Sequence, residues 1–155
     1  MDLLQVTLGE DQSDLAERCR ASCLAGLPDP AVKARVWSEL TDPASKDSLY
    51  VKSAKMQGFY SADQLAIVEP YFERFFDVLV FMHEKTTYKE FSTFFHMMLP
   101  TIVVRDSFIV RLVSLLQEVP DNEQMFAETL KDGIDLLIRS QQVRALAAQE
   151  LQAKL

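Results

Sequence analysis

One run of apolar side chains constrains the fold of this chain more than any other feature of its sequence. Between residues 65 and 82 the apolar positions are separated by steps of three and four: Leu65, Val68, Phe72, Phe75, Leu79 and Met82. Because an α-helix turns once every 3.6 residues, this spacing puts the six side chains on one helical face. Pro70 interrupts the run, so the helix is either kinked there or begun anew, and the preserved register favours a kink.

Helix start and stop signals divide the rest of the chain in the same way. Side chains that accept the free amide protons of a first helical turn precede further apolar stripes. They predict helices that begin at Ser13, at Asp29-Pro30, after Pro43 and Ser45, at Ser61 with Gln64, at Thr87 with Glu90, at Asp106 or Ser107, and at Pro120-Asp121 with Gln124. Helices are expected to end at Gly26, at Gly58 as a left-handed stop, and at Pro100.

The stripes within these helices predict the core and the fold class. They are Val32, Val36, Trp37 and Leu40; Phe91, Phe94, Phe95 and Met98; Phe108, Leu112, Leu115 and Leu116; and Phe126, Leu130, Ile134, Leu137, Ile138 and Gln141. Strand signals are nearly absent, so we expect an all-α fold of about seven antiparallel helices, stacked in pairs as a curved α-solenoid. The Ala-rich end from Arg144 to Leu155 is expected to fray into solvent.

No linker or low-complexity run divides the helices, so residues 13–155 are expected to form a single helical domain. Residues 1–12 form a lead-in segment. Its stretch from Leu3 to Leu8 alternates loosely and could be a strand, a turn of helix or disordered. A start at Met1 suggests an excised or truncated reading frame.

Charge and hydropathy exclude two classes of partner. The 155 residues include 16 basic and 23 acidic residues, a net charge of −7, so binding to phosphate backbones would be repulsive. The longest uncharged stretch, Phe91 to Val104, is broken by Pro100 and is shorter than the ~20 residues that span a membrane. The first twelve residues contain no Lys or Arg and do not resemble a signal peptide. We therefore expect a cytoplasmic protein without nucleic-acid or membrane partners.

The two cysteines do not indicate a metal or disulfide site. Cys19 and Cys23 are four residues apart, on one face of a predicted helix, and their neighbours Arg18, Arg20, Ala21 and Ser22 are not zinc ligands. We interpret them as small buried apolar side chains in a reducing compartment, in preference to a redox or metal role.

The histidines also lack a catalytic setting. His83-Glu84 begins like the zinc-protease motif H-E-x-x-H, but the second histidine position is Thr87, a predicted helix cap. We therefore read His83-Glu84 as a solvated helix end. His96 is expected either exposed on the back of its helix or buried with a backbone partner.

Other candidate groups have structural explanations. The pairs Asp132 with Asp135 and Glu118 with Asp121 are typical of wet helix faces in an acidic chain. The aromatic series Phe72, Phe75, Phe76, Phe91, Phe94 and Phe95 falls at helical spacing and indicates core packing. Arg139 and Arg144 could anchor a carboxylate or a neighbouring domain, although a plain surface role is favoured. We therefore assign no catalytic, cofactor-binding or metal-binding residue to this chain and identify no substrate-binding residue.

The middle of the chain resembles a known family. The motifs are Pro28-Asp29-Pro30 with Lys33 and Val36-Trp37, Met56-Gln57-Gly58-Phe59, Gln64, Glu69-Pro70-Tyr71, Arg74-Phe75-Phe76, Leu99-Pro100, and Arg139-Ser140-Gln141-Gln142-Val143-Arg144. In this order they resemble the C-terminal helical domain of aminopeptidase N-type zinc metallopeptidases, also called the endoplasmic-reticulum-aminopeptidase C-terminal-like domain. The resemblance covers roughly Leu8 to Ala147.

The resemblance implies a HEAT-like helical array that packs on an upstream catalytic domain and encloses and gates its peptide cavity. The parent enzyme would remove N-terminal residues from peptides. The family's G-x-M-E-N motif and its complete H-E-x-x-H motif do not occur in this chain, so zinc is expected only in the catalytic domain. That domain and the parent's peptide substrates are the expected partners, and acidic residues on the inner wall would attract a peptide's ammonium group.

Two other functions remain open from the sequence. The chain could be a free-standing helical-repeat module that binds proteins on its concave face, or an independent hydrolase. An excised domain would also expose a surface that its neighbour normally covers, which would favour self-association.

Overall fold

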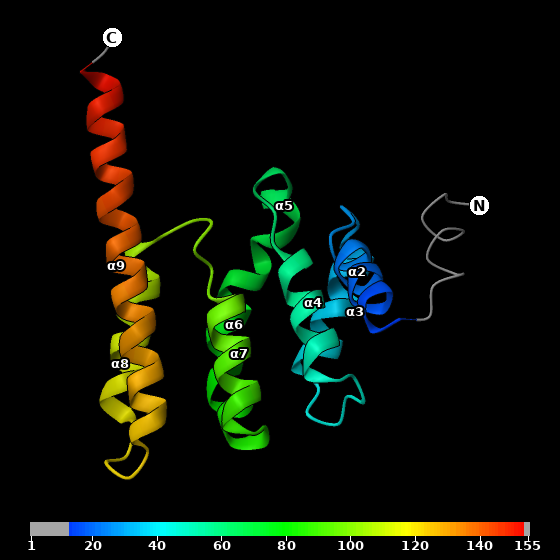
Figure 1. Ribbon diagram of the computed structural model, residues 1–155. Helices are drawn as coiled ribbons and strands as arrows, with labels where there is room; N and C mark the ends of the chain where they lie inside the picture. The colour runs from blue at the N-terminus through cyan, green and yellow to red at the C-terminus, as the bar shows by residue number, and fades with distance from the viewer. Residues whose placement is uncertain (1–12, 154–155) are drawn as a thin grey trace. The chain divides into compact units, whose positions relative to one another are not determined.

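The computed structural model describes residues 13–153, and these residues form eight α-helices, one 3₁₀ helix and no strand (Figure 1). The helices are α2 (Asp14–Ala25), α3 (Pro30–Thr41), α4 (Leu49–Phe59), η1 (Ala62–Gln64), α5 (Leu65–Val68), α6 (Pro70–Lys85), α7 (Tyr88–Met98), α8 (Asp106–Glu118) and α9 (Gln124–Gln152). The all-α prediction is confirmed. The lead-in segment, including Leu3 to Leu8, lies outside the described residues, as do residues 154 and 155.

The helices group into two compact units, Met1–Met98 and Leu99–Leu155. In the described residues the first unit holds α2 to α7 and the second holds α8 and α9. The single domain over residues 13–155 stays a prediction.

The first two helices begin at the side chains that the sequence indicated. The Ser13 hydroxyl accepts a hydrogen bond from the Ala16 amide at 3.2 Å, and the Asp29 carboxylate accepts one from the Ala31 amide at 2.8 Å. Both bonds satisfy amides that have no partner within the helix. Pro30 occupies the first position of α3, where a missing N–H costs nothing.

Only one of the two predicted capping boxes forms. The Thr87 amide donates to Glu90 Oε2 at 3.2 Å, and the Glu90 amide donates to Thr87 Oγ1 at 3.3 Å, which completes the box at the start of α7. Ser61 instead precedes the 3₁₀ helix without a side-chain cap, so this prediction was wrong. The reason is that the Gln64 side chain points elsewhere and donates to the Gly26 carbonyl at 2.8 Å.

The run from Leu65 to Met82 is two helices, so the favoured kink at Pro70 was wrong. Pro70 has no N–H to continue the ladder of α5, and α6 begins anew at this residue. Glu69 keeps helical dihedral angles, φ −52° and ψ −41°, between the two helices. The apolar register therefore survives: the five side chains after Leu65 are buried, while Leu65 is 38% exposed.

An aromatic cluster forms the core of the first unit, as the helical spacing predicted. Trp37 of α3 lies 5.3 Å from Tyr71 of α6 and 6.1 Å from Phe94 of α7, measured between ring centroids. Phe75 stacks on Phe94 at 5.8 Å. The six phenylalanines of the predicted series are all buried. In the α3 stripe Val32 is only half-buried, and Lys33 is buried in its place.

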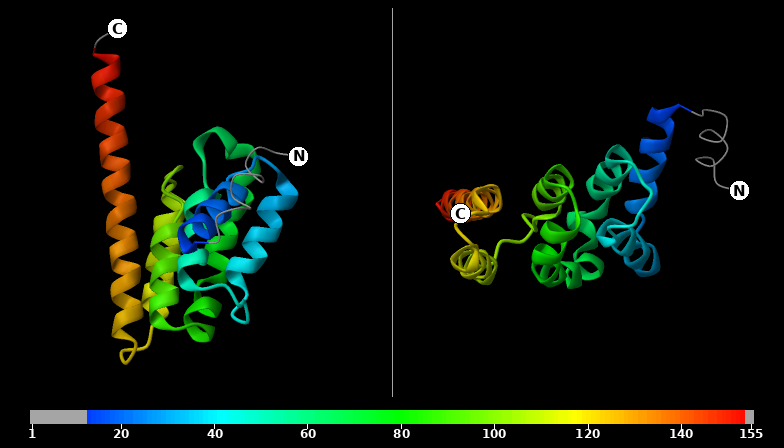
Figure 2. Two further views of the ribbon diagram at one scale, coloured as in Figure 1. Left: turned by 45° about the vertical axis from the view of Figure 1, so that its right-hand side comes forward. Right: turned by 90° about the horizontal axis from the view of Figure 1, so that it is seen from below.

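In the second unit α8 and α9 lie side by side (Figure 2). Phe108, Leu112, Phe126, Leu130 and Leu137 are buried as predicted, whereas Leu115, Leu116, Ile134 and Gln141 are half-buried and Ile138 is exposed.

The predicted fraying from Arg144 is wrong for the described part of this segment, where α9 continues to Gln152 with exposed side chains. Arg144 supports it by donating from Nη2 to the carbonyls of Thr101 and Ile102, at 2.6 and 2.7 Å.

Gly58 permits the closest approach between two helices. The predicted left-handed stop was wrong: among the described residues no glycine has a positive φ, and α4 runs through Gly58 to Phe59. A Cβ atom built on Gly58 would lie 2.1 Å from the backbone carbonyl oxygen of Ser22 in α2. Only a residue without a side chain allows this contact between α2 and α4.

We expect Gly58→Ala to destabilise the protein by about 2 kcal/mol, because backbone atoms of α2 must move to admit the methyl group. Helix propensity alone would favour alanine by about 1 kcal/mol, so a net loss isolates the contact. Urea unfolding measures the difference. Gly26→Ala is the matched control: its Cβ would meet the carbonyl oxygens of Cys23 and Ser22 at 3.4 Å, an ordinary contact. Equal effects of the two substitutions would contradict this account.

Candidate functional site

The C-terminal ends of α2 and α4 meet around a buried lysine. Lys33 of α3 is 0% exposed, and its Nζ donates to the Ala25 carbonyl at 2.7 Å and to the Phe59 carbonyl at 2.6 Å. Ala25 and Phe59 are the last residues of α2 and α4, where carbonyls have no donor within their own helix. One ammonium group therefore satisfies two helix ends and joins three helices. We call this arrangement the Lys33 junction.

Two further contacts complete the Lys33 junction. Gln64 Nε2 donates to the Gly26 carbonyl at 2.8 Å, so a third carbonyl at the same helix ends is satisfied. The Lys33 Nζ also lies 5.2 Å from the centroid of the Phe59 ring, within range of a cation–π contact. A cation is favoured at this place because the negative ends of two helix dipoles point towards it.

Burial and charge act on the Lys33 ammonium in opposite directions. Desolvation lowers the pKa of Lys33 below its ordinary value of 10.5, and the Asp63 carboxylate opposes this shift. The pKa of Asp63 is itself lowered, chiefly by the hydrogen bond from the Ser61 hydroxyl. Among the described residues no carboxylate accepts a hydrogen bond from Lys33, so carbonyl dipoles take the place of a hydrogen-bonded counter-ion.

Two lysines of α4 connect this helix to its neighbours. Lys52, 5% exposed, forms an ion pair with Glu90 of α7 at 3.3 Å. Lys55 bridges Glu39 of α3 at 2.8 Å and Asp47. The pKa of Glu90 lies below its ordinary value of 4.5, chiefly because Thr87 donates hydrogen bonds to its carboxylate. The Lys52 ammonium lowers this pKa further.

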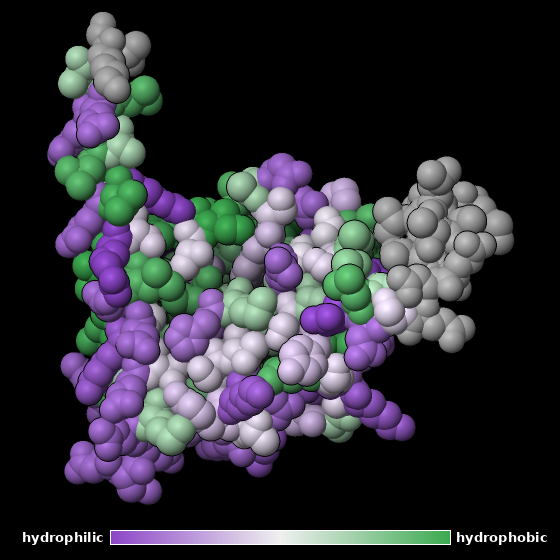
Figure 3. All heavy atoms as spheres, viewed as in Figure 1, coloured by the Kyte–Doolittle hydropathy of each residue, from purple (hydrophilic) through white to green (hydrophobic). Residues whose placement is uncertain are grey.

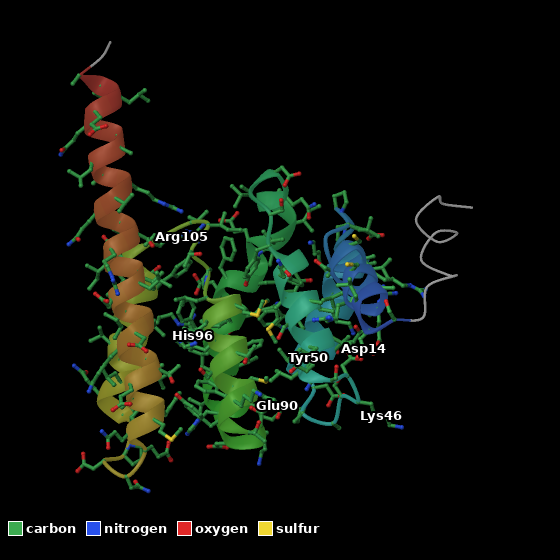
Figure 4. All side chains as sticks on the ribbon, viewed as in Figure 1. Asp14, Lys46, Tyr50, Glu90, His96 and Arg105 are labelled. Carbon is green, nitrogen blue, oxygen red and sulfur yellow. The ribbon has the colours of Figure 1, made fainter. Side chains whose placement is uncertain are left out.

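An open groove runs along α2 and α4. Leu15, Arg18, Cys19, Ser22, Cys23, Tyr50, Ser53, Ala54, Gln57 and Met97 line a cavity of about 460 Å³, and a second cavity shares Arg18 and Tyr50 with it. We call the two together the α2–α4 groove. Its rim includes Leu15 and Tyr50, which are 62% and 71% exposed, and the Arg18 guanidinium lies 5.8 Å from the Tyr50 ring centroid. Tyr50 and Asp14 mark the groove in Figure 4, and Figure 3 shows hydrophobic and polar surface mixed around this region.

The cysteines line this groove, and the prediction that they are buried was wrong. Cys19 and Cys23 are free and exposed. They share one face of α2, as the four-residue spacing predicted, but that face opens into the groove instead of the core.

The two histidines differ in their exposure. His96 is exposed, and its Nδ1 lies 2.7 Å from the Ser92 carbonyl oxygen, which matches the first of the two predicted alternatives. His83 is half-buried with its ring 5.2 Å from that of Phe91, so only Glu84 of the predicted solvated pair is exposed. Thr87 lies beyond α6 and caps α7, as predicted.

The second unit contains both predicted acidic pairs and the two arginines near the C-terminus, Arg139 and Arg144. Asp132, Asp135, Glu118 and Asp121 are exposed as expected. Asp135 forms an ion pair with Arg139, whereas Arg144 binds backbone carbonyls. Among residues 13–153 no three His, Cys, Asp or Glu side chains are grouped to hold a metal ion. A search of the same residues for a helix with the length and apolar character to cross a membrane finds none.

Sequence reasoning missed Lys33 as the centre of the site, although a signal was present. Lys33 occupies a position three residues after Pro30 and four before Trp37, within the buried stripe of α3. A lysine on an apolar stripe must find hydrogen-bond acceptors when it is buried. Free carbonyls at helix ends are such acceptors. The sequence predicts two such helix ends, at Gly26 and at Gly58.

Comparison with protein-family models and with curated proteins finds no match to this chain. The resemblance to the aminopeptidase C-terminal domain therefore stays a prediction.

We expect Lys33→Met to destabilise the protein by about 3 kcal/mol, because two buried carbonyls lose their donor at about 1–3 kcal/mol each. Urea unfolding followed by circular dichroism measures the loss. Lys46→Met removes the same charge at an exposed position near the same helices and should change stability by less than about 0.5 kcal/mol. Two variants of equal stability would show that the junction does not hold the unit together.

Acid should weaken the protein through Glu90. Its folded-state pKa lies below its ordinary value, so its stabilising contribution is present above about pH 4.5 and is lost as pH falls through the folded-state value. The wild type should therefore lose more stability between about pH 5 and pH 3 than Glu90→Gln does. The exposed Glu84→Gln is the control and should follow the wild type. Parallel curves for all three proteins would refute this assignment.

Proposed function

We propose that this chain is the non-catalytic C-terminal helical domain of an aminopeptidase N-type zinc metallopeptidase. In this role it packs on the catalytic domain and helps to enclose and gate the peptide cavity, while the parent enzyme removes N-terminal amino acids. The proposal places the metal and the chemistry in the separate catalytic domain, as the family resemblance implies.

One observation carries this proposal: residues that the resemblance rests on meet in space. Lys33, Phe59 and Gln64 come from three separate motifs, and they make the contacts of the Lys33 junction. Gly58 of the same motifs makes the close approach to α2, and Trp37 packs on Phe59 and Tyr71. Motifs matched by chance would have no reason to converge on one hydrogen-bonded cluster. Their convergence supports a shared structural framework.

The physical properties of the junction suit a wall around a cavity. A wall must keep its shape while the domain moves against its neighbour, because gating is a motion of rigid parts. The Lys33 junction fixes the ends of α2, α3 and α4 to one another with hydrogen bonds of 2.6 to 2.8 Å. Loss of these bonds would loosen the wall without touching the catalytic groups.

The α2–α4 groove favours a second candidate function, a free-standing module that binds proteins. Tyrosine and arginine are common at the centres of protein interfaces, and Tyr50 and Arg18 lie together at the groove. The same groove would also serve the first proposal as a contact to another domain.

The test begins with the reading frame that contains residue 1. We expect the longest polypeptide encoded there to contain H-E-x-x-H upstream and, when purified with zinc, to release the fluorophore from aminoacyl-coumarin substrates. The 155-residue chain alone should release none. A polypeptide without the motif and without activity would favour the binding module, and activity of the chain alone would favour an independent hydrolase.

A variant of the active full polypeptide then tests the role of the wall. Lys33→Met should lower kcat/KM for peptides several residues long by about fivefold or more, while turnover of small aminoacyl-coumarins stays within about twofold, since only long substrates depend on the cavity wall. Lys46→Met is the matched control and should leave both unchanged. Equal losses for both substrate sizes would argue against a gating role.

A further inference from the structure

We propose that the last part of α9 is the interface of a weak antiparallel homodimer, in which residues 136–153 of two copies of this chain pack against each other. This inference does not depend on the proposed function, because its evidence and its test concern only α9.

The last part of α9 extends beyond the helix that packs on it. α9 has 29 residues and α8 has 13, so the two helices rise about 44 Å and about 20 Å along their axes. Figure 1 shows α9 continuing past the end of α8, and Figure 3 shows hydrophobic side chains on the surface of this part. Residues 142–153 are all exposed. Because helices in proteins gain most of their stability from the packing of an apolar face, this part of α9 favours a packing partner.

One exposed face of this part has the spacing of a two-stranded coiled coil. Its central residues, Val143 and Leu146, are 65% and 61% exposed. Steps of three and four residues in alternation, which put side chains on one helical face, extend it in both directions. The six exposed positions are Leu136, Arg139, Val143, Leu146, Glu150 and Ala153. We call this set the α9 seam.

The α9 seam lies on the side of the helix that faces away from α8. Gln141 marks the opposite side, because its Nε2 donates to Asp106 of α8 at 2.6 Å. Glu150 follows Gln141 by nine residues and Arg139 precedes it by two. At about 100° per residue, these two side chains lie about 180° and about 160° around the helix axis from Gln141. The contact with α8 therefore leaves the seam open to a second helix.

The seam is complementary to its own reverse. When two copies run antiparallel about a twofold axis between residues 144 and 145, each Val143 faces Leu146 of the second copy. Each Arg139 then faces Glu150 of the second copy, and each Leu136 faces Ala153. A twofold interface requires this kind of self-complementary surface. The seam therefore brings together two apolar pairs at its centre and one ion pair on each side of them.

Charge favours this orientation over a parallel one. In a parallel pair Arg139 would face Arg139 and Glu150 would face Glu150, so like charges would meet at both positions. Asp135 pairs with Arg139 within the chain, and the five N–H donors of the guanidinium can bind a second carboxylate as well. The positions that flank the seam add no charge: they are Ser140, Gln142, Ala147 and Gln149.

The length of the seam indicates a weak association. About two and a half heptads are shorter than the three or four that stable coiled coils sustain. Exposed ion pairs add little affinity and act mainly on orientation. We therefore expect a dimer with a Kd of about 100 µM, typical of a small transient interface.

Sedimentation equilibrium of the full chain between about 10 µM and about 500 µM tests this association. The mean mass of the wild type should rise with concentration towards that of a dimer. Leu146→Glu places a carboxylate against Val143 of the second copy, so this variant should stay monomeric over the whole range. Leu151→Glu is the matched control: Leu151 is 67% exposed on the same helix, but lies about 140° around the axis from Leu146. The control should associate like the wild type.

Exchange of the two charges tests the orientation. Arg139→Glu and Glu150→Arg should each weaken association about tenfold, because both ion pairs of the dimer become like-charge contacts. The variant that carries both substitutions should regain the wild-type affinity, and a mixture of the two single variants should also associate. In a parallel pair the double exchange would leave the same like-charge contacts as the wild type, so it would rescue nothing.

The proposal is overturned if the wild type remains monomeric at about 500 µM, or if Leu151→Glu reduces association as much as Leu146→Glu does. A double exchange that does not restore association would also overturn it. Circular dichroism at 222 nm checks that each variant keeps its helices. If a single charge variant loses helix, the mixture decides, because the two variants can associate through the seam only when α9 is folded in both.

Discussion

The first unit depends on the hydrogen bonds that the buried Lys33 donates to the ends of two helices. Carbonyls at a helix end must find donors, and water cannot supply them where α2 and α4 meet the rest of the unit. Lys33 supplies them from α3, and Gln64 adds a third bond. Such an arrangement is costly to assemble because an ammonium group must leave water. Its compensation comes from carbonyl dipoles and from the aromatic face of Phe59.

Local signals were sufficient to predict most helices. Ser13, Asp29 and the Thr87–Glu90 pair cap helices as expected, because a cap depends on residues three or fewer positions away. The failures share a different cause. Gly58 and Gln64 were interpreted from sequence neighbours, but their conformations follow from α2, which is far away in the chain. Tertiary contacts therefore decided the positions where local chemistry allowed more than one outcome.

The candidate site shows the same division. The stripe of α3 predicted which face is buried, and Trp37 and Leu40 follow it. The stripe includes the position of Lys33 but could not show which groups accept its hydrogen bonds, because Ala25 and Phe59 lie 8 and 26 residues away. The exposure of Cys19 and Cys23 was missed for a related reason: small side chains fit a core or a groove equally well, and only the position of α4 decides between them.

The reach of Lys33 across three helices has a consequence for the motions of this protein. The end of α2 cannot separate from that of α4 unless the ammonium releases at least one carbonyl, and α3 carries the group that both share. Partial opening of one helix should therefore be coupled to the other two, as in a cooperative foldon. Slow amide exchange in these helices would then report a single shared opening event.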